Sequence, residues 1–206
     1  MTSPPSVSNI SFAPKSGKFV STHLDGRIPK FMLGTNDSPL RSPFGISDPY
    51  SGEDSDRLTF DLEVQDESLL SFLRSIDEHV VSTAVSRSVE WFGRELNEAA
   101  IRAMHTPLVQ APKKDTYLPT VRTKFSLKAG KSTSIYVFKS PGVATTGSKA
   151  DITKGCHARP YVSMSSVMFG NRQFGVSFTC ESVMVWKAAD ASQGLSMYGD
   201  FMLVDA

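Results

Sequence analysis

The sequence has few of the residues that build covalent or metal-held frameworks. It contains two cysteines, Cys156 and Cys180, and four histidines among 206 residues. Two cysteines cannot build a disulfide framework, and a zinc site would need further ligands at matching spacing, which do not stand out. We therefore predict a fold held together by its hydrophobic core, without a metal ion and without a cofactor.

Long apolar runs are also missing. No stretch of 18 apolar residues occurs, so no segment has the length of a membrane-spanning helix. Residues Met1–Pro5 lack the basic and apolar regions of a signal peptide. A hydrophobic fraction of 40% is nevertheless enough for a core and excludes wholesale disorder. We expect an intracellular location, in the cytoplasm or nucleus, and no membrane partner.

Catalytic motifs do not assemble from the sequence. Gly130-Lys131-Ser132 resembles the end of a phosphate-binding loop, but Phe125 stands where that motif requires a glycine. No Gly-x-Ser-x-Gly occurs, and Cys156-His157 is most simply a loop pair, since adjacent side chains seldom point at each other. We therefore expect that the protein is not an enzyme.

The near-zero net charge of +1 conceals an uneven distribution. There are 10 basic and 15 acidic residues up to Gln110, and 12 basic and 6 acidic residues after it. Acidic residues concentrate in 53–67, whereas 111–189 contains 12 basic and three acidic residues. Such asymmetry favours a polyanion-binding region beside an acidic region, although ordinary solvated strand faces would give the same composition.

Hydrophobic periodicity predicts short strands with one helical insertion, which points to a small β barrel or sandwich decorated by helices. Residues 57–64 alternate as a half-buried strand does, and apolar residues then recur at helical spacing after Asp66, a good N-cap. A second helix is expected over about Gly93–Met104, and strands and turns follow from Pro119 onward. We predict a flexible arm over 1–20, a domain over 21–189 with a helical insertion at about 66–104, and a tail over 190–206. Residues 34–56 and 140–158 are predicted as loops.

Aromatic and basic residues share the predicted strands after Pro119. In the strand over 133–139, Tyr136 and Phe138 oppose two aliphatic residues, so one of the two faces cannot be the main core. On an open face, rings about 7 Å apart would stack successive unpaired bases, and neighbouring cations would neutralise phosphates. The alternative is that both rings pack beneath the helical insertion.

The segment from Lys154 to Trp186 has the most distinctive pattern. It runs from Lys154-Gly155 through Arg159 and Tyr161–Phe169 to the turn Gly170-Asn171-Arg172-Gln173, then to Phe174–Phe178 and Val183–Trp186. This segment resembles the hairpin near the end of the single-stranded DNA-binding proteins of large DNA viruses and some bacteriophages. The resemblance implies a mainly β fold, an OB-fold-like five-stranded barrel with a helical layer, and a protein that coats single-stranded DNA in the infected cell.

The resemblance also implies partners. It places Lys154, Arg159 and Arg172 in a groove for the DNA backbone, and it implies replication proteins as further partners. Members of that family often end in a strongly acidic tail that recruits them, whereas Gly199–Ala206 contains only two acidic residues. Self-association through the acidic stretch 53–67 and the N-terminal arm is a further expectation.

The leading hypothesis is sequence-tolerant binding and coating of single-stranded DNA in replication or recombination, through phosphate contacts and base stacking. The residues do not distinguish DNA from RNA. The alternative hypothesis is a viral coat or nucleocapsid protein that assembles through its β core and N-terminal arm.

Tyr117 and Trp186 are weaker stacking candidates. The predicted nucleic-acid-binding residues are Arg122, Lys124, Lys128, Tyr136, Phe138, Lys139, Lys154, Arg159 and Arg172.

Overall fold

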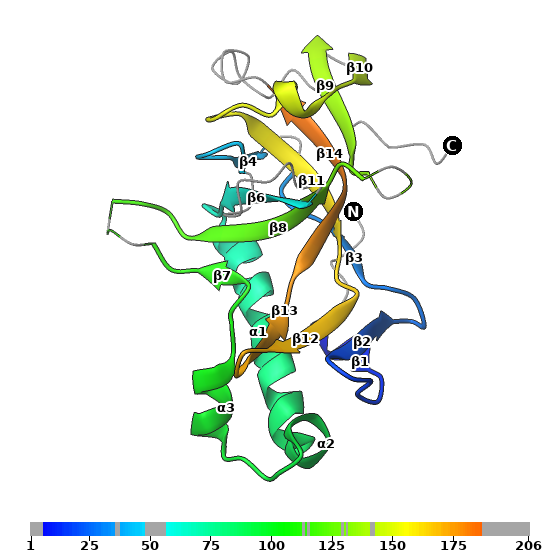
Figure 1. Ribbon diagram of the computed structural model, residues 1–206. Coiled ribbons are helices and arrows are strands. Elements are labelled where there is room, and N and C mark those ends of the chain that lie inside the picture. Colours follow the sequence, from blue (N-terminus) through cyan, green and yellow to red (C-terminus); the bar gives the residue numbers. More distant parts are fainter. Residues whose placement is uncertain are drawn as a thin grey trace.

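Two β-sheets and a helical insertion make up the described part of the chain (Figure 1). The computed structural model describes residues 6–35, 38–47, 57–112, 114, 116–128, 130, 132–140 and 143–186. The predicted tail over 190–206 and the side chain of Lys139 lie outside the described residues. The predicted fold class, mainly β and OB-fold-like with a helical layer, is confirmed, and the larger sheet is a curled half-barrel with more strands than the five predicted.

The larger sheet is organised around β14 (Phe178–Trp186). This strand pairs in parallel with both β8 and β9 and antiparallel with β11. The strands of the sheet follow the order β10-β9-β14-β8-β6-β5. Outside this order, β11 pairs with β14, β3 and β4, and β7 pairs with β8. The remaining strands are β3 (Lys30–Met32), β4 (Leu40–Arg41), β5 (Ile46–Ser47), β6 (Arg57–Glu63), β7 (Val109–Gln110), β8 (Thr120–Ser126), β9 (Ser134–Ser140), β10 (Val143–Thr146) and β11 (His157–Ser163).

The smaller sheet is antiparallel and has the order β1-β2-β12-β13. Its strands are β1 (Ile10–Phe12), β2 (Phe19–Leu24), β12 (Ser166–Gly170) and β13 (Gln173–Val176). The segment Tyr161–Phe169 of the hairpin pattern is therefore divided between two strands, β11 and β12, which belong to different sheets. The chain leaves the larger sheet at the end of β11, where the N–H of Met164 bonds to Pro29, and enters the smaller sheet with β12.

The predicted flexible arm over 1–20 is also wrong for its described part, residues 6–20. Ile10 and Phe12 of β1 are buried, and the ring of Phe12 packs edge-on against Trp91 at 5.7 Å. The predicted loop over 140–158 contains β10, which pairs with β9, and the first residues of β11. In both segments, pairing with other strands supplies the order that local periodicity does not reveal.

The helical insertion consists of α1 (Glu67–Ser86), α2 (Ser88–Phe92) and α3 (Glu98–Met104). The predicted N-cap is confirmed, since the Asp66 carboxylate accepts hydrogen bonds from the N–H groups of Ser68 and Leu69. The second helix does not begin at Gly93: this residue has a φ of 74° and ends α2, as left-handed glycines commonly end helices. Asn97 then caps α3 through the N–H of Ala100.

Asp66→Ala removes this cap and is expected to lower the free energy of unfolding by about 1 kcal/mol. Urea denaturation of the variant measures the loss. Ser71→Ala, at an exposed position within α1, is the matched control and should change stability little. Equal midpoints for the two variants would contradict the capping role of Asp66.

One face of the sheets packs against the helices. The edge-on contacts of Phe31 with Phe72 of α1 and with Phe178 of β14 join the helix to the larger sheet. Trp91 of α2 is fully buried against Phe169 of β12, which joins the helices to the smaller sheet. Through these contacts the helices cover the main core.

Within the described residues, no helix is both long and apolar enough to cross a membrane.

Candidate nucleic-acid interface

The larger sheet has a second face, opposite the main core. In β9, Ile135 and Val137 belong to the main core, so Tyr136 and Phe138 lie on the other side. Strand register extends this face over β14 and β11. We define the second face by Tyr136 and Phe138 of β9, Met184 and Trp186 of β14, and Arg159 and Tyr161 of β11.

The register places these side chains in rows across the strands. Arg159 is opposite Met184, and Met184 is opposite Tyr136, so a cation and an aromatic ring lie in one row with a methionine between them. In the next row, the rings of Phe138 and Trp186 stack face to face, with centroids 4.7 Å apart and planes at 9°. A cation thus lies in a row with the ring of Tyr136, beside a cluster of aromatic side chains, and base stacking together with phosphate neutralisation requires a cation and a ring near each other.

The aromatic cluster does not pack beneath the helical insertion. Phe138, Met184 and Trp186 form a cluster of their own, with Tyr136 and Ala144 packed against it, and among the described residues no helical side chain belongs to it. The alternative that the helices cover these rings is therefore wrong. The helices lie on the main-core side of the sheet, as the contact of Phe31 with α1 shows.

Burial divides the predicted stacking residues. Phe138 is 4% exposed and Trp186 is fully buried, so neither ring offers a free face to a base. The burial of both rings contradicts the prediction that they stack on bases, and one face of each ring is already stacked on the other. Tyr136 is only partly buried and remains the candidate on β9. Tyr117 is 59% exposed in the loop before β8, with the Lys114 Nζ atom 5.9 Å from its ring centroid.

The basic residues of β8 are exposed, as predicted from its alternation. Arg122, however, binds Asp61 of β6 through two hydrogen bonds, Nε–Oδ1 at 2.7 Å and Nη2–Oδ2 at 2.8 Å. This bidentate pair compensates the charge of Arg122, which weakens its assignment as a phosphate contact. Lys124 lies nearer the smaller sheet, with its Nζ atom 3.1 Å from the sulfur of Met168. Lys128 is exposed just beyond the end of β8.

The basic residues taken from the hairpin resemblance do not lie together. Lys154 is exposed in the turn before β11, and Arg159 is partly buried on the second face. Arg172 occupies the two-residue turn between β12 and β13, where Asn171 and Arg172 have φ angles of 46° and 63°. This turn belongs to the smaller sheet, beside the helices and away from β9 and β10 (Figure 1). Arg172 therefore lies on the other sheet from Lys154 and Arg159, because the chain changes sheets before β12, and its place in the groove stays a prediction.

Two aromatic residues escaped sequence reasoning. Tyr161 lies on the second face of β11, and the Lys30 Nζ atom is 5.8 Å from its ring centroid. Phe44 is 62% exposed, in a loop held against the turn that carries Lys154. A Cβ atom at Gly45, which has a φ of 70°, would lie 2.9 Å from the Ile152 carbonyl oxygen. Phe44 and Lys154 are therefore fixed near each other. The sequence signal that could have indicated an exposed ring here is the position of Phe44 between Pro43 and Gly45.

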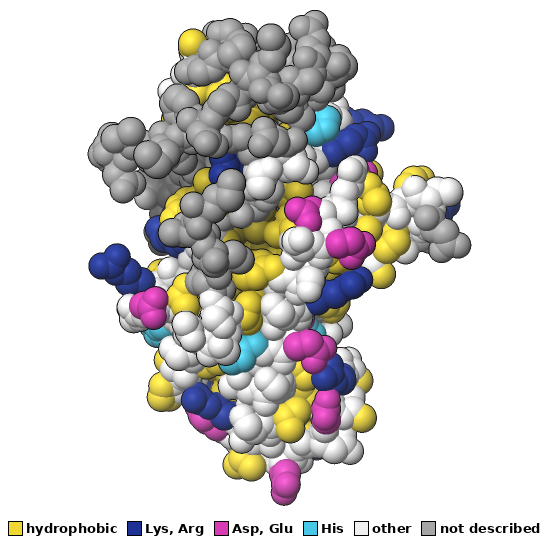
Figure 2. All heavy atoms as spheres, turned by 180° about the vertical axis from the view of Figure 1, so that it is seen from behind, with side chains coloured by type: hydrophobic (Ala, Val, Ile, Leu, Met, Phe, Trp, Pro, Cys, Tyr) yellow, Lys and Arg dark blue, Asp and Glu magenta, His cyan; other side chains and the backbone are white. Residues whose placement is uncertain are grey.

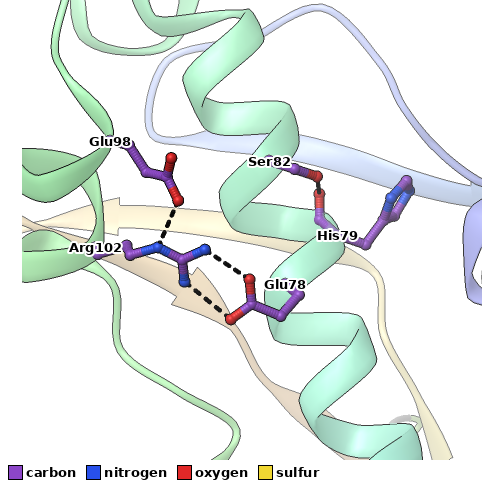
Figure 3. A network of polar contacts seen from close by, with 5 residues as sticks. All are labelled: Glu78, His79, Ser82, Glu98 and Arg102. Atoms are coloured by element: carbon purple, nitrogen blue, oxygen red, sulfur yellow. Dashed lines mark hydrogen bonds and ion pairs between the residues drawn. The ribbon is translucent and has the colours of Figure 1, made fainter.

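The helical side carries mixed charge. Figure 2, which shows the molecule from behind, has basic and acidic side chains interspersed over the helical region instead of a patch of one sign. Figure 3 shows one reason: Arg102 of α3 binds Glu98 within its helix and Glu78 of α1 through both carboxylate oxygens. These pairs join α3 to α1 and leave this side with little net attraction for a polyanion.

The cysteines show no sign of nucleophile activation. Burial raises the pKa of the Cys156 thiol to about 11 and raises the pKa of the Cys180 thiol further. Both thiols are therefore protonated near neutral pH, and the thiolate is the reactive form. In the described part of the chain, no group of three or more His, Cys, Asp or Glu side chains is arranged to hold a metal ion.

Comparison with known proteins finds similarity in structure alone. No protein-family model matches the sequence, and no curated protein matches it significantly. Similar solved structures include the single-stranded DNA-binding protein from bacteriophage Enc34 as a C-terminal truncation (TM-score 0.49, 12% identity, 87% of this chain and 96% of that chain). The same protein in complex with ssDNA gives a TM-score of 0.47 at 12% identity, over 85% of this chain and 93% of that chain.

A further similar structure is gp2.5, a single-stranded DNA-binding protein encoded by bacteriophage T7. It gives a TM-score of 0.48 at 15% identity, over 77% of this chain and 91% of that chain. These similarities are too distant to transfer a function or a binding residue. Both must be inferred from the residues of this chain.

Proposed function

We propose that this chain is a non-enzymatic protein that binds and coats single-stranded DNA in replication or recombination. The observation that carries the proposal is the second face, where Arg159, Met184 and Tyr136 form a row beside the stacked rings of Phe138 and Trp186. A cation in the same row as the partly exposed ring of Tyr136 matches the repeating unit of a nucleotide strand, a phosphate and a base.

The residues divide into two roles. Tyr136, Tyr161 and Phe44 are exposed or partly exposed rings that would stack on bases. Lys128, Lys154 and Arg159 would neutralise phosphates. The remaining residues of the second face, Phe138, Met184 and Trp186, are buried and would support the exposed residues from below.

This arrangement favours unpaired strands of any sequence. Every base has a flat π face, but that face is accessible only when the base is not stacked within a duplex. Binding the unpaired form alone would destabilise a duplex by mass action, without ATP. Phosphate contacts add affinity that does not depend on sequence and weakens with salt.

A salt series tests the proposal. Fluorescence anisotropy with labelled oligo-dT of about 16 nucleotides, within the range that single OB-fold domains cover, should give binding that weakens as salt rises. A duplex of the same length should bind much more weakly. Absence of binding at low salt, or equal affinity for duplex and single strand, would overturn the proposal. Salt-stable particles without nucleic acid in electron micrographs would favour the alternative of a coat protein.

Lys154→Ala is expected to reduce the slope of log K against log salt by about 0.7, the contribution of one phosphate contact on a single strand. Arg94→Ala is the matched control, because Arg94 is an exposed cation just after α2, on the helical side. The control should leave the slope unchanged. Equal slopes for both variants would remove Lys154 from the interface.

A further inference from the structure

Two large apolar side chains are exposed next to each other on the smaller sheet. Phe19 of β2 is 49% exposed and Met168 of β12 is 40% exposed. They are direct partners in the register of the two strands. Their neighbours Val20 and Val167, also direct partners, are fully buried on the opposite side. Phe19 and Met168 therefore lie on the outer face of the smaller sheet and do not contribute to its core.

This apolar pair is continuous with the larger sheet. The Lys124 Nζ atom lies 3.1 Å from the Met168 sulfur, and the Ser177 Oγ atom lies 3.9 Å from the same sulfur. Lys124 is opposite Thr179 of β14 in the parallel pair of β14 with β8. Since β14 also carries Met184 and Trp186, one strand leads from the second face to the position of Lys124.

The chemistry of this continuation suits a nucleotide strand. Phe19 offers an exposed ring, Met168 offers a polarisable flank that packs well against flat surfaces, and Lys124 places a cation beside both. Lys18 is exposed in the turn directly before Phe19 and adds a second positive charge near this ring. Cations near an apolar pair complement a polyanion with apolar bases better than they complement an uncharged apolar partner.

We propose that Phe19 is a second base-stacking site, flanked by Met168 and with Lys124 as its phosphate contact, so that bound single-stranded DNA continues from the larger sheet onto the smaller one. This inference rests on the proposed function and extends its site. It explains why an aromatic ring is exposed on the outer face of a sheet whose other side is a well-filled core.

The test compares Phe19→Ala and Phe19→Trp with the wild-type chain on oligo-dT of about 6 and about 16 nucleotides, which bracket the usual site sizes. Phe19→Ala should weaken binding of the longer strand by about 5- to 150-fold, the range for loss of one stacked base. It should affect the shorter strand much less, because that strand can bind on the second face alone. Phe19→Trp should retain the wild-type affinity for both strands.

The matched control is Val89→Ala, since Val89 of α2 is 63% exposed but lies on the helical side. It should bind both strands as the wild type does, and thermal melting should show that all variants remain folded. Wild-type affinity of Phe19→Ala for the longer strand would overturn the inference while leaving the proposed function intact. A wild-type chain that binds neither strand would overturn both. A change in sedimentation without a change in DNA affinity would assign the patch to contact with a second copy, which also overturns the inference.

Discussion

Phe138→Ala is expected to lower the free energy of unfolding by about 3–5 kcal/mol, the usual cost of truncating a buried aromatic ring. Phe138 is 4% exposed and stacked on Trp186, so its removal leaves a cavity between β9 and β14. Tyr136→Ala should cost less stability because that ring is only partly buried. It should instead weaken binding of oligo-dT by about 5-fold or more, through the loss of a stacked base.

Urea denaturation and DNA titration of both variants separate the two roles. Val143→Ala is the matched control, because Val143 is 50% exposed on the neighbouring strand β10. It should change neither quantity appreciably. If Phe138→Ala kept its stability and lost DNA affinity, the ring would be a stacking residue after all. If Tyr136→Ala kept full affinity, the second face would lose its central contact.

The elements that could be predicted from the sequence are those with local signals. The strand beginning at Arg57 follows from strict alternation, and the start of α1 follows from Asp66 before a helical pattern. The two faces of β9 were also readable, because Tyr136 and Phe138 oppose Ile135 and Val137. In each case the information lies within a few residues of the chain.

The residue-level features that the sequence did not predict come from contacts between distant segments. Arg122 was predicted as a phosphate contact, but β6 brings Asp61 against it. Phe138 was predicted as an exposed ring, but β14 brings Trp186 onto its face. No local pattern announces either partner, because cross-strand neighbours are set by sheet order and register. The position of Arg172 depends on the change of sheets after β11, which periodicity also does not reveal.

The second large effect concerns Asp77, a buried carboxyl on α1. Both of its oxygens accept hydrogen bonds from the N–H of Leu108, and the His105 Nε2 atom lies 3.4 Å from Oδ1. The group lines a cavity of about 630 Å³ bounded by α1, α3 and the segment around β7. Burial is the main cause that raises the pKa of Asp77 to about 7, and the charge of Glu78 raises it further, against the opposing effect of the Leu108 hydrogen bond.

A carboxyl with a raised pKa binds its proton more tightly in the folded state than in the unfolded chain. Its contribution to stability is therefore fully present below about pH 4, the unfolded value, and is lost as the pH rises through about 7. We expect this loss to reach about 4 kcal/mol, from the pKa change of about three units. Asp77→Asn cannot ionise, so its free energy of unfolding should vary less between pH 4 and pH 8. Glu95→Gln, at an exposed carboxyl between α2 and α3, is the control and should follow the wild-type curve.

The direction of the pH dependence also distinguishes Asp77 from its neighbour. Burial lowers the pKa of His105 in the folded protein. The contribution of this imidazole to the free energy of unfolding is therefore present above its unfolded pKa, and it is lost as the pH falls through the lowered pKa of the folded state. The two groups therefore predict opposite slopes between pH 4 and pH 7. Urea denaturation at several pH values measures the slope. If the stability of the wild type falls with rising pH and the Asp77→Asn curve is flatter, the pH dependence is assigned to ionisation of the Asp77 carboxyl. A wild-type stability that rises over the same range contradicts the raised pKa of Asp77 and points instead to groups with lowered pKa values, namely His105 and Glu78.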